Sequence, residues 1–352
     1  MDEATLTDAA LLIGLSQFAE AERVLARVLT EADDRGDDAA AGRALEGLGT
    51  IATRQGQELV ALGLFEQAIE RSGRPDPAER ESLYTNAARL RSMSGDAEGA
   101  VELLEECVRR VREPADHDSA VAAHFAITLS YAYSDAGEYG KAGTVLAGVL
   151  QGGGEDLDLR VRQRLYYALT RLNINTGRTD LAVDYARKMV ELTESAGLED
   201  IMFEALHQCA HALLDAHDPE LAGTYLERAE RHTQGPVDEG FLRVEQARRA
   251  LQLGEYEGAL ELARQAIELL GDRSVPGELG RAYLVQARVY DATGDHSRAD
   301  TAYLMAIDAL EHQTGWPTEL AKAYRRYGKF LRQQGRTDAA MRMLELAGDA
   351  GL

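Results

Sequence analysis

The sequence is poor in the features of a secreted or membrane-bound protein. Its 352 residues include two cysteines, Cys107 and Cys209, which are too few for a disulfide framework. The N-terminus, MDEATLTDAA, lacks the basic and apolar regions of a secretory signal peptide. No apolar run approaches the roughly 20 residues that a membrane-spanning helix needs. We therefore expect a reduced, cytoplasmic protein that does not bind membranes.

Basic residues are scarce as well. There are 38 lysines and arginines against 60 aspartates and glutamates, and the formal net charge is −22. A surface of this charge repels phosphate groups, so we expect no nucleic-acid contact by this chain. The composition, with 45% hydrophobic and 28% charged residues, is that of a folded protein and excludes a disordered one.

Sequence motifs of catalytic or metal-binding sites are missing. No HExxH, paired CxxC or GxSxG pattern occurs. The stretch GEYGKAGT, residues 137–144, has too short a glycine spacing for a phosphate-binding loop, and Ala142 stands where that loop needs a hydroxyl. We therefore expect no enzyme, no catalytic residues, no cofactor and no metal site.

What the chain has instead is a repeated helical pattern. Alternating strand patterns are absent, whereas alanine, leucine, glutamate and arginine dominate, with apolar residues three and four apart. A turn position, usually glycine, recurs every 37 to 42 residues. This anchor position is occupied by Ser16, Gly56, Gly95, Gly137, Gly177, His217, Gly254, Gly294 and Gly335.

Two further positions test this register. Five residues after the anchor the sequence has alanine in all nine units: Ala21, Ala61, Ala100, Ala142, Ala182, Ala222, Ala259, Ala299 and Ala340. Seven residues before it, all residues are small: Ala9, Gly49, Ala88, Ser130, Thr170, Ala210, Ala247, Ala287 and Gly328. Small residues are needed where two helices cross closely. The pattern predicts nine helical hairpins, each with a close helix crossing.

The pattern resembles the tetratricopeptide repeat, which has a small residue in its first helix, a glycine turn and an alanine in its second helix. The resemblance covers the whole chain, although the period is about 40 residues where the family has 34. It implies an all-α, right-handed superhelical solenoid of about nine hairpins, forming one domain over residues 1–352. The glycine-rich stretch at 151–156 is either a hinge or a long loop between repeats.

A closer resemblance is carried by LLDAHDPELAGTYLERA, by RRALQLGEYEGALELARQAIELLGD and by the C-terminal LELAGDAGL. These segments look like the C-terminal sensor half of bacterial helix-turn-helix regulators of the Xre type. The chain starts directly in its first repeat, so we expect no DNA-binding domain within it. The resemblance implies a module that senses a ligand or partner.

The stretch EALHQCAH, residues 204–211, looks at first like one reactive cluster. In the repeat register Cys209 and Cys107 fall at packing positions, so we expect both in the core. His207 and His211 share the other face of the helix. In tetratricopeptide proteins the positions ten and six before the turn face the concave groove. The residues at six before the turn are Ala10, Thr50, Arg89, Tyr131, Arg171, His211, Arg248, Arg288 and Lys329.

No acidic residue occurs in that column, which is unexpected in an acidic chain. Neighbouring groove positions add basic residues, including Arg281, Lys322 and Arg325, but also acids such as Asp135 and Asp215. The expected ligand-binding residues are Arg89, Tyr131, Tyr167, Arg171, Asn175, His207, His211, Arg248, Arg288, Arg325 and Lys329.

Two interpretations of this basic stripe remain open. In one, it binds an anionic ligand such as an acidic peptide or protein segment, because arginine donates paired hydrogen bonds to carboxylates. In the other, the arginines pair with acids on adjacent helices and hold the stack together. A structural adaptor that uses its convex or terminal surfaces, or forms a homodimer, is the alternative function.

Overall fold

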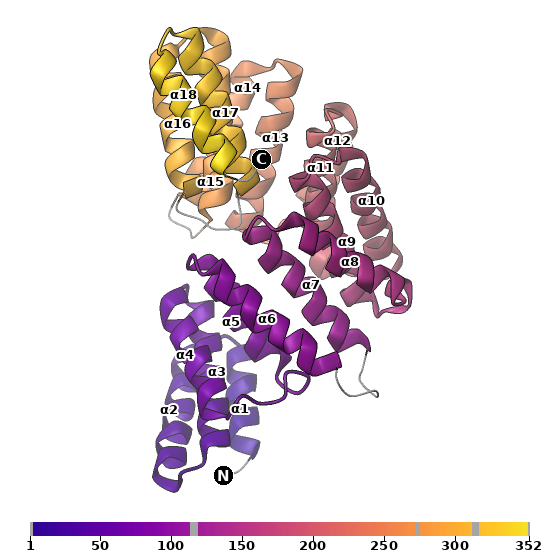
Figure 1. The fold of residues 1–352 in the computed structure, drawn as a ribbon, viewed down its shortest axis with the longest axis vertical. Helices are drawn as coiled ribbons and strands as arrows, with labels where there is room; N and C mark the ends of the chain where they lie inside the picture. Colours follow the sequence, from indigo (N-terminus) through magenta and orange to yellow (C-terminus); the bar gives the residue numbers. More distant parts are fainter. Residues whose placement is uncertain (1–2, 113–118, 272–274, 312–316, 351–352) are drawn as a thin grey trace. The chain divides into compact units, whose positions relative to one another are not determined.

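The structure, a computed structural model, describes residues 3–112, 119–271, 275–311 and 317–350. Within these ranges the regular elements are eighteen α-helices and three short 3₁₀ helices, and no strand occurs (Figure 1). The expected all-α repeat fold is confirmed. None of the described helices combines the length and the apolar character that crossing a membrane requires.

The chain divides into two compact units, Met1–Ala132 and Tyr133–Leu352. Most of α7 (Ser119–Asp135) lies in the first unit and its last turn in the second. The other helices of the first unit are α1 (Glu3–Gly14), α2 (Phe18–Arg35), α3 (Asp38–Arg54), α4 (Glu58–Arg71), α5 (Glu81–Met93) and α6 (Ala97–Arg112).

The second unit holds the remaining α-helices. They are α8 (Tyr139–Gln151), α9 (Leu159–Asn175), α10 (Thr179–Ser195), α11 (Met202–Asp215), α12 (Pro219–Ala229), α13 (Pro236–Leu253), α14 (Tyr256–Leu270), α15 (Pro276–Thr293), α16 (His296–Glu311), α17 (Pro317–Gln333) and α18 (Thr337–Asp349). The stretch 151–156 lies inside this unit and includes the 3₁₀ helix Gly154–Asp156. Hinge motion there, like the right-handed sense of the solenoid, stays a prediction.

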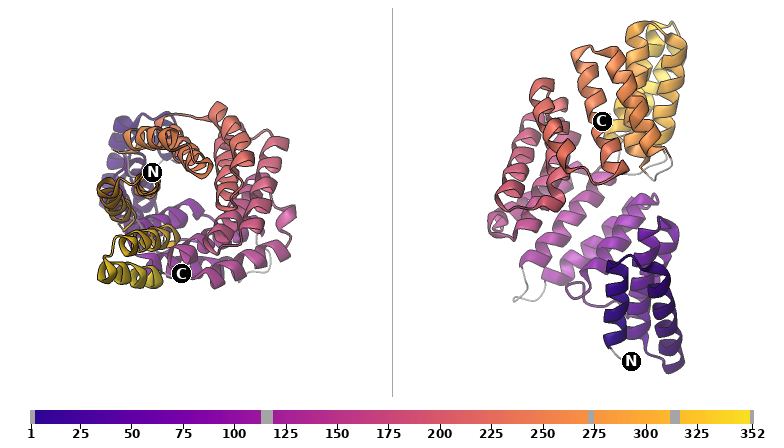
Figure 2. Two further views of the ribbon diagram at one scale, coloured as in Figure 1. Left: turned by 90° about the horizontal axis from the view of Figure 1, so that it is seen from above. Right: turned by 180° about the vertical axis from the view of Figure 1, so that it is seen from behind.

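Consecutive helices pack as hairpins, such as α13 with α14 and α15 with α16. The first helices of neighbouring hairpins also pack on one another, α11 on α13 and α13 on α15. Figure 2 shows the stacked hairpins from α13 to α18, coloured orange to yellow, from two further sides. The first helices therefore form a continuous layer whose side chains can meet from one repeat to the next.

The nine turn positions share one backbone conformation. All nine anchor residues have positive φ, between 59° and 97°. Seven are glycine, for which this region is free of strain. Ser16 and His217 adopt it with side chains, at φ 59° and 61°. The amide of Asp218 donates to the Leu213 carbonyl at 2.9 Å, which satisfies the end of α11.

The small residues of the repeat lie at the helix crossings, as predicted. The nine alanines five residues after each turn are at most 2% exposed. At Gly49 an added Cβ would come 3.0 Å from the Phe65 ring, and at Gly328 it would come 3.2 Å from Leu344. These contacts leave no space for a larger residue, so the crossing distance is set by residue size.

Both cysteines lie in the core. Cys107 and Cys209 are 1% and 0% exposed and form no disulfide. Burial raises the pKa of each thiol to about 12, so both stay protonated and unreactive. The expected packing role of both residues is confirmed.

The strained turn at His217 generates a stability prediction. Replacing His217 with glycine removes the steric cost of a side chain at positive φ, and we expect the free energy of unfolding to rise by about 1 kcal/mol. The matched control is Ala216→Gly, one residue earlier at φ −78°, where glycine only adds freedom to the unfolded chain and lowers stability. Urea denaturation followed by circular dichroism measures both. Equal destabilisation by the two variants would contradict this account of the turn.

Candidate functional site

A set of charged residues links the first helices of hairpins six to nine in the second unit. The helices α11, α13, α15 and α17 each contribute at least two of its members. We call this set the buried ion network; it consists of His207, His211, Asp215, Glu245, Arg248, Glu278, Arg281, Glu319 and Lys322. Its members occupy the inner face where the basic stripe was expected.

Glu245 and Arg281 form the centre of the network. Glu245 is completely buried and Arg281 is 3% exposed. Arg281 donates to Glu245 and, at 2.7 Å, to Glu278 Oε1, while Arg248 Nη1 donates to Glu245 Oε2 at 2.7 Å. Burial favours the neutral form of Glu245, but Arg248 and Arg281 overcome this effect and hold its pKa well below the usual range. The carboxylate is therefore charged and its charge is compensated by two guanidinium groups.

Some contacts of the network span several repeats. Lys322 Nζ on α17 lies 3.1 Å from Asp215 Oδ2 on α11 and 2.8 Å from Glu319 Oε1 on its own helix. Outside the network, Tyr139 Oη on α8 lies 3.0 Å from Thr318 Oγ1 on α17. Hairpins far apart in the sequence thus meet across the inner face. In hairpins six to nine, the face that was expected to line the groove carries paired side chains.

His207 and His211, which were expected to face the concave groove, are both buried. They are 5% and 7% exposed. His207 lies between two aromatic rings, with ring centroids 5.6 Å from Phe203 and 6.0 Å from Phe241, and its Nε2 has no hydrogen-bond partner among the described residues. Burial lowers its pKa to about 4, so the ring is neutral at pH 7. The neighbouring repeats cover both imidazoles.

His211 Nδ1 lies near three charged groups of the network, of which Arg248 Nη1 is the farthest, at 3.4 Å. The same nitrogen lies 2.9 Å from Glu245 Oε1 and 2.7 Å from Arg281 Nη2. The nitrogen can accept a hydrogen bond from Arg281 or donate one to Glu245, but it cannot do both. The tautomer of His211 thus depends on its contacts within the network.

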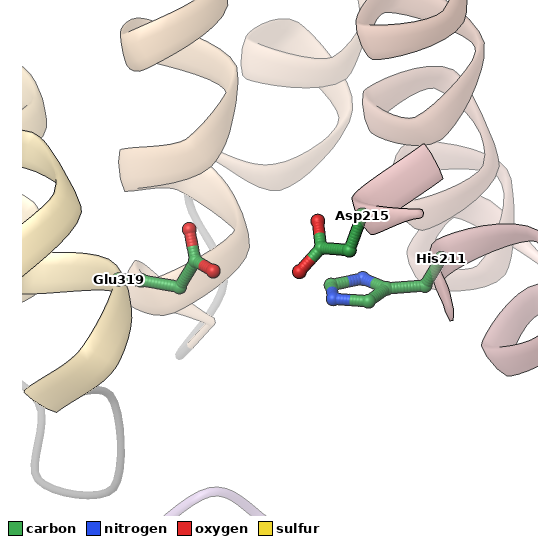
Figure 3. Close-up of side chains that lie close together, drawn as sticks. All are labelled: His211, Asp215 and Glu319. Atoms are coloured by element: carbon green, nitrogen blue, oxygen red, sulfur yellow. The ribbon is translucent and has the colours of Figure 1, made fainter. Parts of the chain in front are cut away.

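Three network residues have the geometry of a metal site. His211, Asp215 and Glu319 each place a ligand atom within 4.8 Å of the others (Figure 3). Protein cations already neutralise this group: Arg248 and Lys322 bind Asp215, and Lys322 binds Glu319. The lysine ammonium lies between the two carboxylates that a divalent ion would bridge. The three residues are therefore better explained as part of the ion network.

Internal pairing also accounts for other members of the expected stripe. Arg171 on α9 binds Asp135 at 2.6 Å, and Arg248 binds Asp215 and Glu245. Tyr167 accepts a hydrogen bond from Gln208 at 3.3 Å, and burial raises its pKa to about 12. Asn175 ends α9 and is half-buried. The structure thus shows Arg171 and Arg248 paired with acids on adjacent helices.

In the first unit, the two expected residues are Arg89 and Tyr131. Arg89 on α5 is exposed and donates to Met93 Sδ at 3.0 Å. Tyr131 on α7 is half-buried. The ion pairs of this unit use other positions, such as His124 with Glu81 at 2.8 Å.

The last two hairpins hold a different kind of site. A cleft of about 390 Å³ lies between α15 and α17, and we call it the Arg288 cleft. Its polar lining consists of Arg288, Asp291, Tyr303, Arg326, Lys329 and Gln333. Among the residues that the structure describes, Arg288, Arg326 and Lys329 form no ion pair or hydrogen bond. Arg325, which was also expected to bind the ligand, is exposed on α17.

The groove positions identified Asp215, but they did not identify the other acids of the network, which are Glu245, Glu278 and Glu319, or the cation Arg326. The signal was present in the sequence as acid–base pairs three residues apart. Glu245 precedes Arg248, Glu278 precedes Arg281 and Glu319 precedes Lys322 by this spacing, which places each pair on one helix face. Arg326 stands nine residues before its turn, where Glu245 stands two repeats earlier.

The paired and unpaired arginines should differ in their effect on stability. Arg281→Met leaves Glu245 and Glu278 buried with less compensation, and we expect a loss of about 3–5 kcal/mol. Arg288→Met removes a half-buried cation without an acidic partner, so stability should stay the same or rise. Chemical denaturation of both variants measures the difference. Similar losses in the two proteins would show that Arg288 also supports the fold.

His207 makes the fold sensitive to acid. Its pKa is about 4 when folded and about 6.5 when unfolded, so the unfolded chain takes up a proton first as the pH falls. The contribution of His207 to the free energy of unfolding is at its maximum above pH 6.5 and decreases towards pH 4. Between pH 7.5 and pH 5 it falls by about 2 kcal/mol. The lowered pKa of Glu245 adds a loss at lower pH, while the raised pKa of Glu278 acts in the opposite direction.

The test is His207→Phe, which keeps an aromatic ring between Phe203 and Phe241 and removes the titrating group. We expect the dependence of the denaturation midpoint on pH to flatten between pH 7.5 and pH 5. His232→Phe is the control, because His232 is half-buried near Glu199 and lies outside the network. An unchanged pH profile in His207→Phe would assign the acid sensitivity to another group.

No protein-family model matches the sequence, and no curated protein sequence matches it. Solved structures do match the fold. A Rap protein complexed with Competence and Sporulation Factor aligns over 99% of this chain and 96% of its own, with TM-score 0.66 and 11% identity. The apo quorum sensor NprR from B. thuringiensis aligns over 87% and 86%, with TM-score 0.64 and 15% identity.

A tetratricopeptide repeat protein from Parabacteroides merdae aligns over 80% of this chain and 98% of its own, with TM-score 0.58 and 16% identity. At such low identities the likeness concerns the fold. Together with the nine turns and the nine buried alanines, it shows that the chain has a tetratricopeptide-like helical repeat fold.

Proposed function

We propose that the chain is a non-enzymatic module that binds an anionic peptide or protein segment through the inner face of its repeats. The observation that carries this proposal is the group of cations at the last two hairpins: Arg288, Arg325, Arg326 and Lys329. None of them has an acidic partner among the residues that the structure describes. In a chain of net charge −22 they form a local basic surface.

The repeat register supports the placement of this surface. Arg288 and Lys329 stand six residues before their turns, as His211 and Arg248 do in earlier repeats. The earlier pair contacts residues of neighbouring first helices, so this position faces the inner layer. On this layer, Arg248 pairs with Asp215 and Glu245. Arg288 and Lys329 form no ion pair among the described residues, so both are available to a ligand.

The solved structures with this fold support a role in recognition. One of them is a quorum sensor, and another is a Rap protein in complex with a factor. We place this chain as the ligand- or partner-sensing part of a bacterial transcriptional regulator. Its partner is an acidic segment, and its own charge argues against a contact with nucleic acid.

A structural adaptor is the second candidate. The last helix, α18, exposes Met341, Leu344 and Leu346, which is unusual for the outer surface of a terminal repeat. Such residues suit self-association or a partner at the end of the solenoid. In this case the cations of the last two hairpins would have no role in binding.

Fluorescence anisotropy with a labelled octapeptide of alternating glutamate and alanine tests the proposal. We expect it to bind, to bind more weakly at about 300 mM than at about 50 mM NaCl, and to lose affinity about tenfold when Arg288, Arg325 and Lys329 are all changed to glutamine. A matched peptide of lysine and alanine should not bind.

The control protein carries the same loss of charge on second helices, at Arg264, Arg298 and Arg342. It should bind the acidic peptide like the unchanged protein, because these residues lie on α14, α16 and α18. Equal weakening in both variants would mean that only net charge matters. Absence of binding to the acidic peptide, together with a dimer in sedimentation that Met341→Glu disrupts, would favour the adaptor.

A further inference from the structure

The Arg288 cleft combines a concave space with uncompensated positive charge. Arg288 comes from α15, Arg326 and Lys329 come from α17, and Asp291 is the acid of the lining. Burial, together with the nearby positive charges of Arg326 and Arg248, lowers the pKa of Arg288 to about 10. The guanidinium is still charged at pH 7, but the folded protein disfavours that charge. A bound anion would stabilise the charged guanidinium and so offset the unfavourable effects of burial and of the neighbouring cations.

The cleft differs in this respect from three arginine sites of the inner face that the structure describes. Arg171, Arg248 and Arg281 each donate to at least one carboxylate. The residue nine before the turn is Glu245 in the seventh hairpin and Arg326 in the ninth. The sequence thus places a second cation where the network has its central acid, and the last two hairpins are left with an excess of positive charge.

We propose that the Arg288 cleft binds one carboxylate of the anionic segment, with the Arg288 guanidinium donating to both of its oxygens. This inference rests on the proposed function and assigns the group that the site recognises. Arginine matches a carboxylate in geometry through two parallel hydrogen bonds. Arg326 and Lys329, on α17, add a positive electrostatic potential around this carboxylate.

The other lining groups select against a bare phosphate. Asp291 is an acceptor and would repel a phosphate dianion, whereas it can accept a hydrogen bond from a peptide N–H next to the carboxylate. Gln333 can donate to or accept from the same backbone. Burial raises the pKa of Tyr303 to about 12, so its hydroxyl keeps its proton and is a donor. A carboxylate attached to amide groups uses all of these atoms.

The size of the cleft limits what enters it. Its volume of about 390 Å³ is near the lower end of ligand pockets, which span roughly 300–1,000 Å³. It therefore holds one acidic residue of a longer segment. The carboxylate comes either from an aspartate or glutamate side chain or from the C-terminus of the segment, and the two sources share the same chemistry.

Three pools of random N-acetylated hexapeptides separate these sources. The first pool has free C-termini and includes aspartate and glutamate, the second is amidated and includes them, and the third is amidated with asparagine and glutamine in their place. Each pool is incubated with the full chain, and the peptides that stay bound through gel filtration are identified by mass spectrometry. Variants Arg288→Gln, Arg288→Lys and the charge-matched control Arg342→Gln are treated in the same way.

We expect the unchanged protein and Arg342→Gln to retain carboxylate-bearing peptides at least about tenfold more than the third pool, because the charged hydrogen bonds to Arg288 are absent there. Retention of the second pool assigns the side-chain source, and retention of the first pool alone assigns the C-terminus. Arg288→Gln should reduce retention to the level of the third pool, and Arg288→Lys should restore part of it. Both variants should unfold at or above the temperature of the unchanged protein.

Three results would overturn the inference. If Arg288→Gln retains the same peptides as the unchanged protein, the segment binds elsewhere on the inner face, and the proposed function stands without this cleft. If inorganic phosphate displaces the retained peptides as well as acetate does at equal concentration, the site is a general anion site. If the unchanged protein retains peptides from none of the pools, the proposed function fails together with the inference.

Discussion

The close crossing of the two helices in each hairpin is the constraint on which the rest of the structure depends. The alanine five residues after each turn is buried in all nine repeats, and the residue seven before each turn is small. Where this residue is Gly49 or Gly328, even one added carbon would press on a neighbouring side chain. Because the helices approach so closely, the turn between them must reverse the chain sharply, and all nine anchor residues adopt the left-handed conformation that allows it.

The stacking of the hairpins has an electrostatic consequence in the second unit. First helices that lie side by side bring their inner faces together, so charged residues on those faces lose their contact with water. Buried charges are tolerated only when they are paired and hydrogen-bonded. The buried ion network meets this condition with four carboxylates and three cations, and burial together with the charge of Glu245 raises the pKa of Glu278 in this excess of acid. The network and the Arg288 cleft are two outcomes of one arrangement: acids outnumber cations in the network, and cations outnumber acids in the cleft.

The fold could be predicted from the sequence almost completely. The turn positions, the small residues at the crossings and the burial of Cys107 and Cys209 follow from a register read from the sequence, because each depends on contacts within one hairpin or between adjacent ones. The candidate site could be predicted only in part. The register placed Arg248 and His211 on the inner face, but it could not show that Asp215 and Glu245 would reach them.

The sequence by itself determined the number of hairpins, the class of fold and the face on which the cations lie, since these features repeat every 37 to 42 residues and are set locally. Only the tertiary structure decided which cations are neutralised. Lys322 and Asp215 are 107 residues apart and meet because the inner faces of four hairpins converge. The distance between such residues depends on how every intervening hairpin packs, and a local sequence pattern does not contain this information. For this reason, only the tertiary structure shows that Arg248 and Arg281 pair with acids and that Arg288 has no ion-pair partner among the described residues.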